Sequence, residues 1–189
     1  MYASVRHCYA SGRVFEAFYH NYIFSIVKFN SGTASGNQSI PHKLDNVPSF
    51  IIMKSTSNSY NWDIYHKGIS NSKDGRLIFT TAAFSTTHAP FGGVDPTSSV
   101  FTFNQSFYGN NIDSVAYLWC DVPGLQKFGR YVGNGINNGP YVELGFKPAL
   151  VVIKSTVGGT SRNWATIDST RSYANVGNHT LAWNMHAAE

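Results

Sequence analysis

Two tryptophans, each directly after an asparagine, are the residues best suited to hold a ligand. Asn61-Trp62 follows Tyr60, and the same dipeptide recurs as Asn163-Trp164. An exposed indole stacks on a pyranose ring while neighbouring amides bond its hydroxyl groups, so these five residues predict a glycan-binding surface. The opposing interpretation, which we favour, is that a tryptophan recurring in a repeat belongs to the core.

Acidic residues near the ends of expected strands are the candidates for hydrolytic chemistry. A glycosidase needs two carboxyl groups roughly 5 to 10 Å apart. The four candidates are Asp63, Asp121, Glu143 and Asp168. Solvated strand ends and turn caps explain them more simply, so we expect no enzyme and no catalytic residue.

Other patterns that carry chemistry are missing or weak. The seven histidines lack the spacing of a metal peptidase, and no Gly-x-Ser-x-Gly elbow occurs. The Gly133-Asn134-Gly135 triplet lacks the helix that a phosphate-binding loop needs. A calcium site built from turn Asp and Asn residues stays open as an alternative, although no Asp-x-Asp-x-Asp run exists. We therefore expect no metal and no cofactor.

The elements that carry the two tryptophans are copies of one another. From Pro48, and again from Pro148, the chain reads proline, a small residue, four apolar residues and then Lys-Ser-Thr, and both copies resume at Asn-Trp after a polar loop. We interpret this as a duplicated unit. A short apolar run after a proline suits a buried strand better than an amphipathic helix, so each copy predicts a β-hairpin.

Short apolar segments separated by turn-forming residues recur along the chain. This pattern predicts an all-β chain with a sandwich or jelly-roll-like fold and little helix. The expected strands of the first unit, including 114–122 as the central one, are 23–29, 38–42, 50–54, 62–66, 76–81, 99–104 and 114–122. We divide the chain into an N-terminal arm or extension (1–22), a first sandwich unit (23–126) and a partial second unit (127–189).

The second unit is expected to be incomplete. Segments 128–135 and 141–145 correspond to 26–32 and 38–44, but 99–104 and 114–122 have no counterpart. Half a sandwich cannot bury one face of its sheet. The second unit therefore packs on the first, is completed by another chain, or is cut from a longer array.

Aromatic residues near both ends predict an oligomer interface. Phe15, Phe18 and Tyr22 fall at helical spacing in a segment that is either a short helix or an extended arm. Unless something covers them they form an exposed apolar patch. Near the other end, one face of an expected last strand carries Leu181, Trp183 and Met185. We expect a homo-oligomer in which these residues contribute to the contacts.

The composition fits a surface whose polarity comes from amides and hydroxyls. Of the 189 residues 42% are hydrophobic and only 13% are charged, about half the usual share. The net charge is +4 and the basic residues are scattered, which argues against nucleic-acid binding. No signal peptide and no membrane-spanning run is expected, so synthesis in a cytoplasm follows. The spacing of the two cysteines, Cys8 and Cys120, does not match that of a metal site. Cys120 lies in an apolar run and is expected to be a buried thiol.

Several segments together resemble a domain of unknown function found in virion proteins of tailed, often marine, bacteriophages. They include Asn61-Trp62-Asp63 and Val115-Ala116-Tyr117-Leu118-Trp119-Cys120, and the full set is 47–54, 61–67, 96–102, 115–124, 127–135 and 144–154. The resemblance covers about residues 23–189.

The resemblance implies a virion structural role, most often in tail fibres or adjacent components, with assembly and host-surface presentation as the function. It favours a trimer and contact with other virion proteins, and it brings no known active site. Capsid decoration is the alternative within the same class. A lectin-like module for host polysaccharide is the alternative from another class.

Overall fold

The computed structural model describes residues 23–136, 138–158, 162–171 and 179–185, together with the backbone of 6–10 and 13–20. In this part of the chain nearly all regular structure is antiparallel β-sheet. Helical structure is limited to a four-residue helix, α1 (Gln105–Tyr108), and a three-residue 3-10 turn, η1 (Ser72–Asp74). The predicted all-β, sandwich-like class is therefore confirmed.

The largest sheet has seven strands, and every neighbouring pair is antiparallel. Segment 114–122, predicted to be the central strand, forms β9 and pairs along both edges, with β3 and with β5. The order across the sheet is β1 (Arg6–Ala10), β2 (Arg13–His20), β3 (Phe24–Asn30), β9 (Asp113–Trp119), β5 (Phe50–Ser55), β6 (Asp63–His66) and β7 (Leu77–Ile78).

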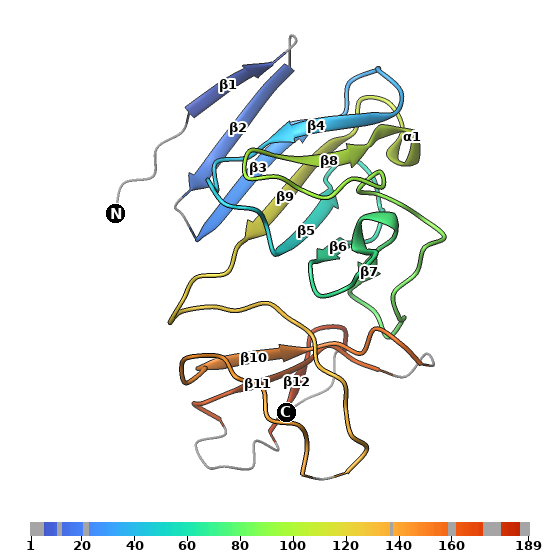
Figure 1. Cartoon of the computed structure of the whole chain (residues 1–189). Coiled ribbons are helices and arrows are strands. Elements are labelled where there is room, and N and C mark those ends of the chain that lie inside the picture. The colour runs from blue at the N-terminus through green and yellow to red at the C-terminus, as the bar shows by residue number, and fades with distance from the viewer. Residues whose placement is uncertain are drawn as a thin grey trace.

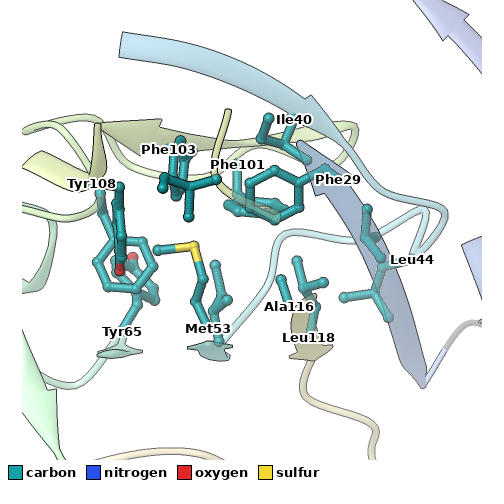
Figure 2. Close-up of a cluster of buried hydrophobic side chains, with 14 of the residues drawn as sticks. Phe29, Ile40, Leu44, Met53, Tyr65, Phe101, Phe103, Tyr108, Ala116 and Leu118 are labelled. Atoms are coloured by element: carbon teal, nitrogen blue, oxygen red, sulfur yellow. The ribbon is translucent and has the colours of Figure 1, made fainter. Parts of the chain in front are cut away.

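A second sheet of two strands covers one face of the large sheet (Figure 1). It consists of β4 (Asn37–Pro41) and β8 (Val100–Asn104). Between the two sheets lies the main core, in which side chains from β4 and β8 meet those from β3, β5 and β9 (Figure 2). The ring of Phe29 contacts Phe101 and Phe103 edge to face, at centroid distances of 5.9 and 5.0 Å. Cys120 is buried in this core.

The opposite face of the large sheet is also buried, which explains the unbroken apolar run of β5. Ile51 and Met53 point into the main core, whereas Phe50 and Ile52 belong to a second apolar cluster. That second cluster also contains Trp164, from the second half of the chain. A strand covered on both faces reads as continuously apolar instead of alternating.

A third sheet repeats the geometry of the first hairpin (Figure 1). It consists of β10 (Leu150–Ile153), β11 (Ala165–Asp168) and β12 (Leu181–Ala182). Ile52 pairs with Ile64 in the first copy, and Val152 pairs with Thr166 at the equivalent place in the second. All four residue pairs of β5–β6 recur in β10–β11, and both pairs of β6–β7 recur in β11–β12. The sequence repeat is thus a structural repeat with the same register.

The repeated lysine closes the loop of each hairpin. In the first copy the Lys54 ammonium donates to the Tyr60 carbonyl, and in the second the Lys154 ammonium donates to the Arg162 carbonyl at 2.6 Å. Each accepting carbonyl stands two residues before the tryptophan. A single charged donor therefore fixes where the polar loop returns to the strand, although the two loops differ in length by two residues.

Two strands predicted for the second unit are absent. Segments 128–135 and 141–145 are irregular, although their sequences resemble segments that include β3 and β4. In the first unit these strands bond β9 and β8, and the described part of the second unit holds no counterpart of either. An extended segment without a neighbouring strand cannot form the backbone hydrogen bonds that define a β-sheet.

Near the N-terminus the structure shows an extended conformation, one of the two alternatives, a short helix or an extended arm, that the sequence left open. Residues 13–20 form β2 between β1 and β3, so sheet pairing prevails over the helical spacing of the aromatic residues there. Tyr22 and the side chains of Phe15 and Phe18 lie outside the described residues. Only Leu77–Ile78 of segment 76–81 forms a strand, because Thr80 N–H turns back to the Ile78 carbonyl at 2.8 Å.

Strand β12 ends at Ala182, so the predicted strand face of Leu181, Trp183 and Met185 does not form. The chain turns after β12, and Met185 N–H donates to the Ala182 carbonyl at 3.2 Å. No helix among the described residues is long and apolar enough to cross a membrane.

His42 is a buried histidine whose ring nitrogens both contact the backbone. Its Nε2 lies 3.1 Å from the Thr97 carbonyl, and its Nδ1 accepts from Leu44 N–H at 3.3 Å. This arrangement suits the neutral ring that carries its proton on Nε2. Burial lowers the pKa of His42 below its ordinary value of 6.5, against the opposing effects of the Thr97 carbonyl and Asp45.

We predict that the free energy of unfolding falls as the pH is lowered from 7.5 to 5. A lowered folded-state pKa means that the unfolded chain binds the proton more readily, so stability is present above pH 6.5 and lost below it. His42→Asn, which keeps an acceptor near Leu44, should show a smaller fall in urea unfolding. His88→Asn, at an exposed position, is the control. Equal pH slopes for wild type and His42→Asn would contradict the prediction.

Candidate functional site

Trp164 lies in the interior, between the third sheet and the outer face of the large sheet. Only 3% of it is exposed, and its indole N–H donates to the Ile78 carbonyl at 2.9 Å. Its ring packs edge to face on Phe79 at 5.1 Å and stacks on Trp183 at 6.2 Å. A residue held in this way fixes the third sheet on β7 and is not placed to meet a ligand.

Trp62, the equivalent residue of the first copy, is 38% exposed. It precedes β6, and its ring lies 6.1 Å from Phe79 and 6.4 Å from Tyr117. The remainder of the indole faces solvent. The same motif thus gives one buried and one accessible tryptophan, because only Trp164 has the other copy's strand packed against it.

Four aromatic rings form the contact between the two copies. Phe79 follows β7 and Trp183 follows β12 at the same distance, so the pairs Trp62–Phe79 and Trp164–Trp183 are equivalent. Their centroid separations are 6.1 and 6.2 Å. The pairs meet where Phe79 contacts both Trp164 and Trp183.

An open hollow of about 480 Å³ lies beside these rings. Its lining is aromatic except for one amide and one thioether, with Trp183 46% exposed. The residues that form it are Trp62, Phe79, Trp183, Asn184 and Met185.

The Asn184 side chain is held in a fixed orientation at the hollow. Its Oδ1 accepts from the backbone N–H of Trp164 at 2.9 Å, and its Nδ2 donates to Asn163 Oδ1 at 2.9 Å. A primary amide can donate twice and accept twice, so these two bonds leave capacity for another partner. Aromatic faces beside a fixed amide suit a ligand with apolar faces and hydroxyl edges.

Of the five residues predicted to contact a glycan, the structure places only Trp62 at this hollow. Tyr60 packs on Phe107 and Tyr108, in a different place. Asn61 is exposed but does not line the hollow, and Asn163 bonds Asn184 and Met185. Phe79 and Asn184 were missed. The repeat itself holds a signal for them, because Leu77-Ile78-Phe79 and Leu181-Ala182-Trp183 occupy equivalent places.

A buried polar cluster around Asp63 is the other chemical feature of the structure. The carboxylate is fully buried, accepts from Arg76 Nη1 at 2.6 Å and accepts from the Tyr108 hydroxyl. Burial raises the pKa of Asp63 against the opposing effects of Tyr108 and Arg76. The guanidinium also lies over the Phe107 ring at 5.3 Å. The cluster ties β6 to the start of β7 and to α1.

The other three candidate carboxylates each have a different neighbour. Asp121 pairs with Lys67, Glu143 accepts from the Tyr141 hydroxyl, and Asp168 pairs with Arg171. None of the four shares a partner with another in the contacts that the structure describes. No group of three potential metal-ligating side chains occurs in that part of the chain either.

The fold and the hollow define an all-β, sandwich-like domain with a repeated hairpin and an aromatic contact surface. The chain belongs to the family of domains of unknown function DUF7483, which matches residues 19–189. Searches of curated proteins and of solved structures returned no significant match.

We predict that Trp164→Ala lowers the free energy of unfolding by about 3–5 kcal/mol, because it empties a buried site and removes the indole hydrogen bond to the Ile78 carbonyl. The matched variant Trp62→Ala removes the equivalent but half-exposed indole and should cost at most about 2 kcal/mol. Urea unfolding of both variants gives the comparison. Equal losses would contradict the assignment of Trp164 as the anchor.

Thr166 offers a change that should stabilise the protein. It is 3% exposed, and its hydroxyl has no hydrogen-bond partner in the described part of the chain. The first copy has a buried isoleucine, Ile64, in its place. We predict that Thr166→Val raises the free energy of unfolding by about 1 kcal/mol. Thr166→Ser, which keeps the hydroxyl and loses the methyl group, should be less stable than wild type in the same unfolding experiment.

Proposed function

We propose that the chain is a non-enzymatic structural component of a tailed-phage virion, most suitably tail-associated, that acts in assembly and host-surface presentation. The segments quoted above resemble virion domains, and the charge-poor, amide-rich composition fits a virion surface. The chain would be made in the host cytoplasm and reside in the virion. Capsid decoration is the alternative position within the same class.

The observation that carries this proposal is the number of exposed apolar side chains in the segment from the end of β9 to the start of β10. Tyr141 is 86% exposed and Val132 is 81% exposed. Contact with another chain would remove such side chains from water. From the end of β9 to the first residue of β10, the exposed large apolar residues are Leu125, Tyr131, Val132, Ile136, Tyr141, Val142 and Leu150.

Self-association of the chain would cover these exposed residues. The resemblance favours a trimer, which closes without leaving unsatisfied interfaces. A stable interface of this kind buries well over about 1,000 Å². Contacts with other virion proteins would cover the remainder.

We predict that purified virions of the phage that encodes this chain contain it as a stoichiometric component, and that the isolated protein forms a stable trimer. Quantitative mass spectrometry of virions tests the first statement and light scattering at micromolar concentration tests the second. Tyr141→Ser combined with Val132→Ser should weaken the trimer. Absence of the chain from virions would contradict the structural role, whatever the oligomeric state.

A second candidate function is binding of host polysaccharide at the aromatic hollow. The specific observation is that Trp62 and Trp183 both keep an exposed ring beside Asn184, whose orientation is fixed by two hydrogen bonds. Such a surface fits a pyranose ring, with its C–H face on an indole and a hydroxyl on the amide.

On a glycan array, we predict that Trp62→Ala and Trp183→Ala each weaken binding by about tenfold, the equivalent of one lost stacking contact. Tyr60→Ala is the matched control, because Tyr60 is an equally exposed aromatic residue that does not line the hollow. No binding by the wild-type protein, or an equal loss in Tyr60→Ala, would remove this candidate.

A further inference from the structure

The repeated three-strand frame has a neighbour in the first copy that the second copy lacks. In the first copy β5 pairs with β6 along one edge and with β9 along the other, over six residue pairs from Phe50–Trp119 to Ser55–Ser114. In the second copy β10 pairs, among the described residues, with β11 alone and lies at the edge of its sheet. Because all residue pairs within the frame are equivalent, the outer edge of β10 is equivalent to the edge of β5 that β9 covers.

The side chains of β10 show the consequence. Phe50, Ile51, Ile52 and Met53 of β5 are all buried, whereas none of the four apolar residues of Leu150–Ile153 is. Leu150 is 57% exposed. A four-residue apolar strand at an exposed edge is a template for pairing with another chain.

The backbone groups available at this edge can be assigned from the ladder. Ser169 N–H donates to the Ala149 carbonyl at 2.9 Å, so Ala149 faces β11. Backbone groups alternate along an antiparallel strand, so those of Val151 and Ile153 also face β11. The N–H and C=O groups of Leu150 and Val152 therefore point to the open edge.

We propose that the open edge of β10 binds an antiparallel strand from a neighbouring polypeptide, with the alternating chemistry of β9. The inference rests on the proposed role in assembly, because that role supplies the partner chain. It identifies the open edge of β10 as one interface for that role. The chain's own β9 is not available, since β3 and β5 occupy both of its edges.

The equivalence of the β10 edge to the β5 edge that β9 covers indicates which side chains the bound strand should carry. One face of β9 carries Ala116 and Leu118 into the main core, and the other carries Tyr117 and Trp119 to the second cluster. An equivalent strand beside β10 would alternate small or aliphatic residues with aromatic ones. It would also be uncharged where it faces Leu150–Ile153, because these residues offer no charge and the Lys154 ammonium is already bound by the Thr81 and Arg162 carbonyls.

A synthetic peptide with the sequence of residues 112–122, with serine in place of Cys120 and two lysines at each end for solubility, tests the proposal on the full-length protein. Hydrogen–deuterium exchange should show slower exchange in 149–155 as the peptide is added, with no change in β5. Leu150→Pro removes an edge N–H and should weaken peptide binding by about tenfold or more. Leu150→Ala loses only the side chain and should bind more tightly than Leu150→Pro.

Several results would overturn the proposal. The first is that the peptide does not slow hydrogen exchange of the 149–155 amides in the wild-type protein. The second is that a scrambled peptide slows it equally. The third is that exchange slows in β5, which would mean that the peptide replaces the protein's own β9. Slow exchange of 149–155 without peptide, dependent on protein concentration, would mean that a second copy's own edge fills the place. If Leu150→Pro fails to fold, Leu150→Lys serves as the blocking variant, because it sets a charge against an apolar strand. Peptide binding is measured on isolated protein, so its failure is distinct from absence of the chain from virions.

Discussion

The burial of Trp164 against the outer face of the large sheet is the contact on which the two halves of the structure depend. Its indole N–H donates to the Ile78 carbonyl, and its ring packs against both Phe79 and Trp183. Together with Val152 and residues of the first half such as Phe84, Trp164 covers the side chains of β5 and β6 that face away from the main core. The β4–β8 sheet covers one face of the large sheet, and the third sheet packs on the other face. The apolar residues of β10 in the third sheet are themselves only partly buried.

The duplication therefore gives two copies with unequal surroundings. The first copy has β9 at its edge and β4 and β8 over its face, and its apolar residues are buried on both sides. The second copy keeps the strand register and the lysine that closes the loop, but its described residues include no such neighbours. The similar local sequences give the same strand register, whereas the burial of each side chain depends on what packs against it. This explains why one repeated tryptophan is an anchor and the other is accessible.

The sequence predicts the local elements well because their causes are local. Proline before a four-residue apolar run, followed by a turn-rich loop, is sufficient to place both hairpins, and the long apolar segment around Leu118 is sufficient to mark the central strand. Segments 128–135 and 141–145 were predicted wrongly for the opposite reason, since a strand exists only where a partner strand bonds it. Near residue 18 the sequence left a short helix and an extended arm open, and pairing with β1 and β3 decides for the extended conformation.

The candidate site shows the same limit. Trp62 could be singled out from its motif, but Phe79, Trp183 and Asn184 meet it only through the packing of the two copies. The cluster of Asp63, Arg76 and Tyr108 joins residues far apart in the chain, and no spacing in the sequence marks it. Such sites follow from tertiary contacts, and the repeat is the one feature of the sequence that points toward them.

Native-state hydrogen exchange of the wild-type protein at increasing urea concentration is the most direct test of this account, in which a second, less covered copy is held on the first by Trp164. The account predicts two cooperative units: the amides of β10 and β11 exchange through a partial opening, and those of β5 and β9 only through global unfolding. Exchange of β10 as slow as that of β5 at every urea concentration would contradict it.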